Sequence, residues 1–453
     1  MLFVSLAIAT LSSGTYGQQV MSLEDIYRMA DENSQSMKVY QTAQESASAS
    51  VKEAKSAFLP DINLSLSGSY IGNATLMDRK FSTHGTTEIH YAIAPYVGQA
   101  ALGKQDTPHW GNNFAFEASQ VLYAGGAISA GVRMAKLGEQ MAALDYQKNQ
   151  QDIRFLLTGY YLDLCKLLNL QEVVSRNIEL TQKVLDNMHA RFEQGTVLRN
   201  DITRYELQLE NLQLQLTQLK DAASIINHQL ASTLHLPEGS AILPDTMQLK
   251  TEGQRLYAGS SVEQHWQEQA AQSNIGLQQA QLAANIADQQ LKASKAQNVP
   301  HIALIAEDHL GGPYTNDLIP VDANTNAWFI GVGIRYNLSS LYKNNHSVRK
   351  AKIEVQKANE SVALAQEGVE NGVQASHVNY MTAFSEVRTQ EKSVELAKEN
   401  YSVICNRYEN DLALLTDMLD ASNILLSADM GLVNAQINLI YNYYKLKYIT
   451  HTL

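Results

Sequence analysis

The clearest pattern along the chain is helical. Hydrophobic residues recur at steps of three and four from residue 202 onward, at Ile202, Tyr205, Leu209, Leu212, Leu216 and Leu219. The preceding segment shows similar steps, at Leu157, Tyr160, Leu164, Leu167, Val174, Ile178 and Leu185. Steps of this kind place all members on one face of a helix, as in the seam of a coiled coil. The pattern predicts two long helices joined by a turn.

The first of these helices is long because no proline interrupts residues 127–188. At ~1.5 Å per residue such a helix extends ~90 Å, a length that suits a tube or a rod. A plain antiparallel coiled coil would explain the same hydrophobic stripes. Strand patterns elsewhere in the chain favour a membrane protein over that alternative.

Four shorter segments have the alternation of strands, near 61–70, 113–123, 301–308 and 328–338. In the first, Ile62, Leu64 and Leu66 alternate with Asn63, Ser65 and Ser67, and the last alternates in the same way from Trp328 to Leu338. Each has about the ~9–11 residues that a tilted strand needs to cross a bilayer. Membrane barrels start at about eight strands, so four cannot close one. The sequence therefore predicts a homo-oligomer of two or three copies.

The chain carries an internal repeat. Arg191-Phe192-Glu193-Gln194 returns as Arg407-Tyr408-Glu409-Asn410 at a constant offset (407 − 191 = 216), and Asp201 returns as Asp417 at the same offset. A second offset of 240 pairs Leu59-Pro60 with Val299-Pro300 (299 − 59 = 240). Each half therefore has the same order of elements: helix, proline, strand, loop, strand, long helix, long helix.

These features divide the chain into four parts. Residues 1–17 resemble a secretory signal peptide without its positive start, which predicts export. Residues 18–235 form repeat 1, residues 236–261 a linker around the waist of the helical part, and residues 262–453 repeat 2. Loops near 73–111 and 309–326 join the strands and are expected to face the cell exterior. No later segment is expected to be a transmembrane helix.

Composition excludes several classes of function. The 34 basic and 46 acidic residues give a net charge of −12, and the basic residues are scattered, which argues against a nucleic-acid surface. The two cysteines, Cys165 and Cys405, do not occupy matching repeat positions, and we interpret them as buried or incidental thiols.

No catalytic or cofactor site is predicted. The Gly125-Gly126 pair lacks the Gly-Lys-Ser/Thr ending of a phosphate loop, and a strand-to-helix turn fits it better. The 12 histidines show no metal-binding spacing. Asp417 and Asp420 could be read as an acid and a base, but no histidine, nucleophile or metal pattern accompanies them. The sequence predicts no enzyme, no cofactor and no metal.

The strand start at Leu59-Pro60, the turn Gln120-x-Leu122-Tyr123-x-Gly125-Gly126 and the two tip motifs together resemble the TolC family of outer-membrane efflux proteins. The resemblance covers essentially the whole mature chain. It implies a homotrimer whose 12 strands, four from each chain, form one outer-membrane β-barrel. A long α-helical coiled-coil tunnel through the periplasm continues that barrel.

The resemblance also implies site residues at the helical tips. Asp417 and Asp420 match the family's pair of aperture carboxylates, and a spacing of three places both on one helix face. Two carboxylates near a helix start can also serve only to favour the helix dipole. Asp201 and Tyr408 match the positions that link the tips in the closed state. The sequence departs from the family pattern at two positions: Ala413 stands where the best-studied type of member has an arginine, and Asp411 replaces the tip glycine. A weaker or differently built lock is therefore expected.

The implied function is passive conduction in the exit duct of a tripartite efflux pump. The tips near Gly195, Thr196, Asp411 and Leu412 would contact a periplasmic adaptor, and an inner-membrane pump would supply the energy. The alternatives are a type I protein-secretion duct and, from another class, a periplasmic coiled-coil adaptor or structural rod. An adaptor carries one helical hairpin, whereas this chain is predicted to have two hairpins and four membrane-length strands.

Overall fold

The computed structural model describes residues 19–70, 109–237, 240–245, 263–315, 320–321, 323–410 and 412–453. The chain divides into two compact units. Unit 1 comprises residues 1–48, 137–285 and 357–453, and unit 2 comprises residues 49–136 and 286–356. The expected signal peptide and most of the 73–111 loop lie outside the described residues.

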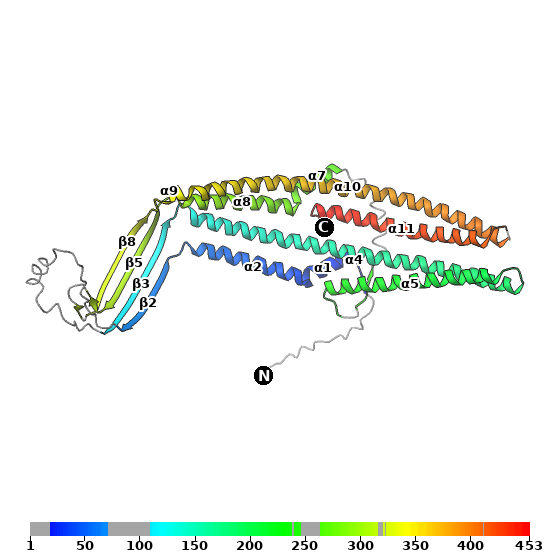
Figure 1. Ribbon diagram of the computed structural model, residues 1–453, viewed down its shortest axis with the longest axis horizontal. Coiled ribbons are helices and arrows are strands. Elements are labelled where there is room, and N and C mark those ends of the chain that lie inside the picture. Colours follow the sequence, from blue (N-terminus) through cyan, green and yellow to red (C-terminus); the bar gives the residue numbers. More distant parts are fainter. Residues whose placement is uncertain are drawn as a thin grey trace, which may run out of the picture. The chain divides into compact units, whose positions relative to one another are not determined.

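Unit 2 is built on a four-stranded antiparallel sheet (Figure 1). Its strands are β2 (Asp61–Tyr70), β3 (Trp110–Tyr123), β5 (His301–Gly312) and β8 (Thr325–Arg335), which lie in that order across the sheet. The four strands confirm the predicted number. β5 is longer than predicted, and β8 both starts and ends three residues earlier, so Tyr336 and Leu338 follow the strand.

The sheet registers follow the internal repeat. Leu66 lies opposite Phe114 in the β2–β3 pair, and its repeat mate Ala306 lies opposite Ile330 in the β5–β8 pair. The offsets of 240 (306 − 66) and 216 (330 − 114) are those found in the sequence. Two short strands, β6 (Tyr314–Thr315) and β7 (Pro320–Val321), pair with each other within the segment predicted as a loop.

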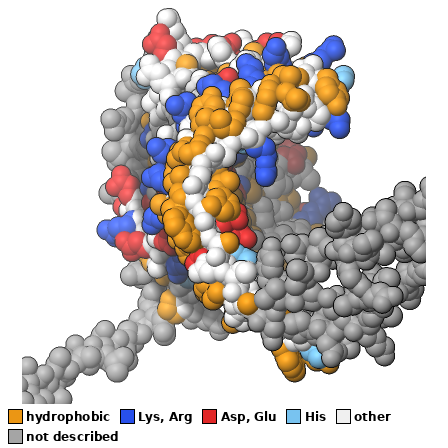
Figure 2. All heavy atoms as spheres, turned by 90° about the vertical axis from the view of Figure 1, so that its left-hand side faces the viewer, with side chains coloured by type: hydrophobic (Ala, Val, Ile, Leu, Met, Phe, Trp, Pro, Cys, Tyr) orange, Lys and Arg blue, Asp and Glu red, His pale blue; other side chains and the backbone are white. Residues whose placement is uncertain are grey.

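One face of the sheet carries exposed apolar side chains. They come from even-numbered positions, and the edge strands contribute Ile62, Leu64, Leu66, Trp328, Ile330, Val332 and Ile334. Figure 2 shows hydrophobic side chains gathered in a continuous band at the sheet end of the chain. A soluble sheet would cover such a face, so this arrangement is typical of a sheet in contact with lipid.

Unit 1 is helical, and its elements repeat with equal or nearly equal lengths, α4 and α10 differing by two residues (67 − 65 = 2). The first half contributes α1 (Leu23–Asn33), α2 (Gln35–Ser56), α4 (Ala127–Glu193) and α5 (Arg199–Thr233). The second half contributes α7 (Glu263–Ser273), α8 (Ile275–Ala296), α10 (Asn345–Glu409) and α11 (Leu415–Ile449). Parts of α2, α4, α8 and α10 belong to unit 2. α5 and α11 both have 35 residues, and both are followed by a histidine at positive φ, His235 and His451.

Apolar packing between helices holds unit 1 together. The largest cluster of buried residues joins α1, α4, α5 and α11 and includes Ile26, Leu157, Tyr161, Leu230 and Tyr444. Two short strands add to it, β1 (Gln19–Met21) and β4 (Ile242–Pro244), because the Tyr161 hydroxyl donates to Met21 O and accepts from Asp245 N. The buried hydroxyl of Tyr161 is thus satisfied both as a donor and as an acceptor.

The apolar composition of α11 bears on the expectation that no later segment is a transmembrane helix. The helix is long and apolar enough to cross a membrane by length and composition, whereas no such helix was predicted. Its apolar residues serve packing instead, since Leu425, Leu426, Leu439 and Leu446 belong to buried clusters with α4 and α10. A helix that packs part of its apolar surface against neighbouring helices passes the same hydropathy test.

The strand-to-helix turn between β3 and α4 requires glycine. Gly125 and Gly126 have φ of 61° and 85°, which residues with a side chain rarely adopt. A Cβ on Gly125 would also overlap Val299 Cγ2 and lie 2.9 Å from Ala296 O. A Cβ on Gly126 would meet nothing closer than 3.7 Å. The short helix α9 (Ser340–Lys343) occupies the corresponding place before α10.

Gly125→Ala should therefore destabilise the fold more than Gly126→Ala. Both variants carry the strain of positive φ, about 1 kcal/mol, but only the first also pushes α8 away from the turn. Thermal unfolding in mild detergent, followed by circular dichroism, measures the difference. Equal midpoints for the two variants would show that the close approach at Gly125 contributes nothing.

Candidate functional site

The tip of repeat 1 is a tight turn between α4 and α5. Gly195 ends α4 at a φ of 75°, where glycine is the favoured residue. Thr196 closes the helix end, since its backbone N–H and its hydroxyl both donate to Arg191 O, at 3.1 and 3.0 Å. The turn thus satisfies a carbonyl that the helix itself leaves without a partner.

The tip of repeat 2 repeats this bond. The Leu412 N–H donates to Arg407 O at 2.8 Å, and the Arg407 guanidinium donates to Leu412 O at 3.2 Å. Asp411, one of the expected contact residues, lies outside the described residues. Leu412 and Leu414 are exposed, as is Leu198 at the first tip. Both tips therefore present apolar side chains to solvent.

Asp417 and Asp420 both lie in the first turns of α11 and are exposed. Asp417 Oδ2 accepts a hydrogen bond from the Leu414 N–H at 3.1 Å. This bond satisfies one of the backbone donors at the helix start. Asp417 therefore has a local structural role at the start of α11.

Asp201 occupies the place in α5 that Asp417 has in α11, the third residue of the helix. It is partly buried. Tyr408 lies near the end of α10, and its ring is 5.6 Å from the Arg191 guanidinium carbon of α4. The structure thus places Tyr408 against the first tip through Arg191, a residue that the sequence analysis did not assign to the site.

An apolar cluster joins the two tips behind this contact. It consists of Leu185, Met188, Ile202, Tyr205, Leu209 and Leu415, with Tyr408 and Leu419 packed against it. Burial raises the pKa of the Tyr205 phenol, and the neighbouring Tyr401, Tyr408 and Cys405 add to the shift. Tyr205 therefore remains neutral at any physiological pH and acts as a packing residue between the hairpins.

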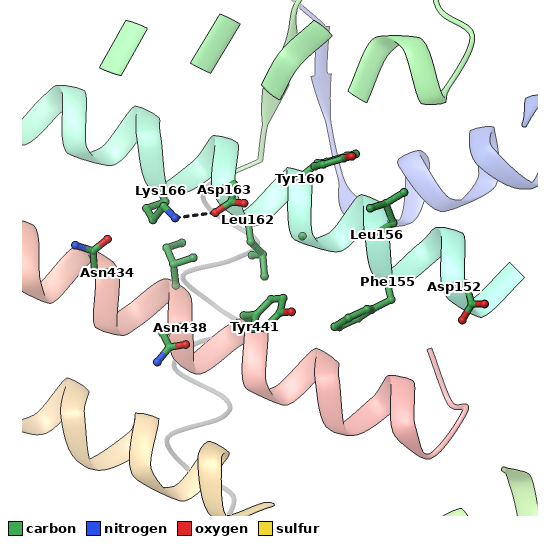
Figure 3. A pocket seen from close by; sticks show the side chains of 12 residues that line it. Asp152, Phe155, Leu156, Tyr160, Leu162, Asp163, Lys166, Asn434, Asn438 and Tyr441 are labelled. Atoms are coloured by element: carbon green, nitrogen blue, oxygen red, sulfur yellow. Dashed lines mark hydrogen bonds and ion pairs between the residues drawn. The ribbon is translucent and has the colours of Figure 1, made fainter. Parts of the chain in front are cut away.

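Further along the helices, α4 and α11 border a groove of about 620 Å³ (Figure 3). Lys166 and Asp163 form an ion pair of 2.7 Å at one end. At the other end Phe155 stacks on Tyr448 with ring centroids 4.4 Å apart, and the Tyr448 hydroxyl donates to Asp152. Burial, together with the Asp152 carboxylate, raises the pKa of Tyr448 to about 12.

Among the described residues, no group of three or more His, Cys, Asp or Glu side chains is arranged to hold a metal ion. Cys165 is buried and Cys405 partly buried, and both are free thiols. Burial raises the pKa of Cys165, which makes that thiol unreactive.

The chain combines a sheet of membrane-spanning length with two long helical hairpins. This combination is typical of outer-membrane channel proteins with a helical extension. The chain belongs to the outer membrane efflux protein family, whose pattern matches residues 26–234 and 266–449. It is an outer-membrane efflux channel of the TolC family that extends into the periplasm, and it is not an enzyme.

Individual relatives agree with this assignment. The chain is 23% identical to the outer membrane protein TolC of Vibrio cholerae over 100% of its own length and 95% of that protein. It is 22% identical to the TolC protein of Salmonella enteritidis over 68% of its own length and 62% of that protein. The crystal structure of the outer membrane protein VceC from Vibrio cholerae superposes with a TM-score of 0.73, at 16% identity, over 95% of this chain and 96% of that chain. Homologues in the family form trimeric channels.

Removing the Asp417 carboxylate should loosen the start of α11. In Asp417→Ala the Leu414 N–H loses its acceptor, at a cost of about 1 kcal/mol to the local helix end. Hydrogen exchange at the first turn of α11 should then become faster, while Asp420→Ala, the matched control on the same face, should leave it unchanged. Equal exchange rates in both variants would mean that the capping hydrogen bond of Asp417 does not stabilise the start of α11 in solution.

Proposed function

We propose that three copies of this chain form the exit duct of a tripartite efflux pump. In this proposal a 12-stranded barrel crosses the outer membrane, and the helical hairpins form a tunnel that opens at its periplasmic tips. The unpaired edges of the four-stranded sheet are the observation that carries the proposal.

The sheet needs partners on both sides. Within the part of the chain that the structure describes, β2 and β8 each pair on one side only. In a bilayer, backbone groups without partners cost several kcal/mol each, so an open sheet with a lipid-facing surface is unstable there. The opposite face of the strands carries Asn63, Ser65, Ser67, Glu117 and Glu307, which suit a water-filled lumen.

The internal repeat gives the register of the missing strand pair. β3 and β5 are the repeat mates of β8 and β2, and they pair within the chain with Ala118 opposite Ala306. Applying the two offsets (118 + 216 = 334; 306 − 240 = 66) places Ile334 of one copy opposite Leu66 of the next. Both side chains lie on the apolar face, which agrees with this register. A register shifted by one residue would pair a lipid-facing side chain of one strand with a lumen-facing side chain of the other.

The tips supply the gate in this proposal. Asp417 and Asp420 from three chains would form two rings of carboxylates that attract cations to the narrowest part of the duct. Asp201 and Tyr408 would link neighbouring helices in the closed state. Gly195, Thr196, Asp411 and Leu412 would contact the periplasmic adaptor, and the exposed leucines at both tips favour such a contact.

Energy would come from an inner-membrane pump coupled through the adaptor. Repeat 1 (18–235), the linker (236–261) and repeat 2 (262–453) would then act as one unit of the tunnel wall. A type I protein-secretion duct requires the same barrel and tunnel and differs in cargo. A periplasmic adaptor or rod would have no use for a four-stranded sheet with an apolar face.

A thiol crosslink tests the barrel. With Cys405 replaced by serine, Leu66→Cys combined with Ile334→Cys should give covalently linked trimers on oxidation in outer-membrane vesicles. The control is Leu66→Cys with Ile330→Cys, which lies on the same face but about 13 Å further along β8 at ~3.3 Å per residue. Monomers from the first pair, together with a monomeric native mass in detergent, would overturn the trimeric barrel.

Conductance tests the carboxylate rings. Asp417→Asn combined with Asp420→Asn should lower the selectivity of single channels for cations over anions, because up to six charges leave the aperture. Glu399→Gln on α10, an exposed carboxylate away from the tips, is the control for loss of charge alone. Unchanged selectivity in the double variant would place these carboxylates away from the conduction path.

A further inference from the structure

The four helices that adjoin the sheet, α2, α4, α8 and α10, each carry two basic residues spaced by three positions. This spacing places both side chains of a pair on one face of the helix. The pair on α2 recurs on α8 at the offset of 240 (292 − 52 = 240), and the pair on α4 recurs on α10 at the offset of 216 (349 − 133 = 216). The eight residues, which we call the basic collar, are Lys52 and Lys55, Lys292 and Lys295, Arg133 and Lys136, and Arg349 and Lys352.

The basic collar is a local excess of positive charge in an acidic chain. The whole chain has a net charge of −12, whereas the segments 49–60, 124–136, 286–300 and 335–356 carry 11 basic and 3 acidic residues (11 − 3 = 8). All eight side chains of the collar are exposed. Lys292 pairs with Asp288 at 2.8 Å, and within the described residues the other seven form no ion pair. Most of this charge is therefore available to a partner outside the chain.

The helix dipole explains only half of the collar. A cation near the C-terminal end of a helix is stabilised by the dipole, and Lys55 and Lys295 lie in the last turns of α2 and α8. Arg133 and Arg349 lie within the first two turns of α4 and α10, where the dipole gives a cation no such benefit. What the four pairs share is their place. Each lies within ~14 Å of the helix end nearest the sheet, at ~1.5 Å per residue.

Exposed apolar and aromatic side chains lie along the chain between the strands and the collar. They are Phe58 and Leu59 before β2, Leu122 and Tyr123 at the end of β3, and Tyr336, Leu338, Leu341 and Tyr342 after β8. The order away from the sheet is therefore an apolar face, an aromatic zone and then basic residues. A membrane surface has the matching order of hydrocarbon, interface and charged headgroups. In Figure 2, which looks onto the sheet end, Lys and Arg side chains border the hydrophobic band.

We propose that the basic collar binds the phosphate groups of anionic phospholipids in the periplasmic leaflet of the outer membrane. The channel lies in that membrane and extends into the periplasm, so the helix ends beside the sheet lie at the level of this leaflet. Lys and Arg can lay their aliphatic parts along apolar surface and hold their charges among the headgroups. The partner is lipid because the collar continues an apolar face that is itself typical of contact with lipid. Positive charge on all four helix ends then fixes how deeply the sheet sits in the bilayer.

Lipid selection tests the proposal. The full-length channel is placed in nanodiscs of phosphatidylcholine and phosphatidylglycerol, and the lipids that stay bound after its release are counted by native mass spectrometry. The unmodified channel should retain phosphatidylglycerol in excess over its share of the bilayer. Because each basic residue near an anionic surface strengthens binding by about fivefold, a variant that lacks half of the collar should lose most of this excess. That variant combines Arg133→Gln, Lys136→Gln, Arg349→Gln and Lys352→Gln.

The matched control removes the same number of exposed basic residues from helices of unit 1. It combines Lys183→Gln, Lys220→Gln, Lys392→Gln and Lys398→Gln, and it should keep the excess of phosphatidylglycerol. Circular dichroism shows whether both variants keep their helices. The lipid preference of the unmodified channel decides the proposal even if the collar variant does not fold.

No excess of phosphatidylglycerol on the unmodified channel, or an equal loss in the collar variant and the control, would overturn the proposal. A collar variant that keeps the lipid preference but changes the ion selectivity of single channels would also overturn it, since the charges would then line the lumen. Inorganic phosphate is the last comparison. If it raises the unfolding temperature of the detergent-extracted channel as much as phosphatidylglycerol does, the collar binds phosphate without the lipid, and the proposal is wrong.

Discussion

The need to pair every backbone group of the sheet is the constraint on which the rest of the structure depends. Four strands with two unpaired edges and an apolar face are stable in a bilayer only as part of a closed barrel. In the trimer that we propose, closure would also place the hairpins around a common axis. The equal lengths of α5 and α11 then matter, because a tunnel wall built from unequal helices would leave gaps at its end.

Much of this fold could be predicted from the sequence because the repeat reports element lengths directly. The 216 offset fixed the matching ends of α4 and α10 at Glu193 and Glu409, and the 240 offset fixed the matching starts of β2 and β5. The predicted end of β8 at residue 338 was wrong, because the side chains after Arg335 determine where the strand stops. The Asn337 side chain accepts hydrogen bonds from the backbone and hydroxyl of Ser339, which favours a turn where alternation alone continues the strand.

The site was less accessible to sequence analysis. The motif that contains Arg191 and Tyr408 was visible in both repeats, but the contact between these residues joins positions more than 200 residues apart. Periodicity assigns a residue to a helix face and cannot say which hairpin it faces. The sequence analysis allowed for a local role of Asp417 at the helix start, as the alternative in which the carboxylates only favour the helix dipole. Tyr205, in contrast, gave no sign of its place between the hairpins beyond its position in a hydrophobic stripe.

The contacts at the tips bear on how a closed state would be held. Ala413 stands where the best-studied type of family member has an arginine, and in the described part of the tips an apolar cluster and a cation–π contact lie between the hairpins. Salt screens interactions between exposed charges over about 8 Å at physiological ionic strength, but it does not weaken apolar burial. Tips held mainly by Leu185, Met188, Ile202 and Leu415 would therefore stay closed across changes in ionic strength, and opening would require a partner that competes for the same apolar surface.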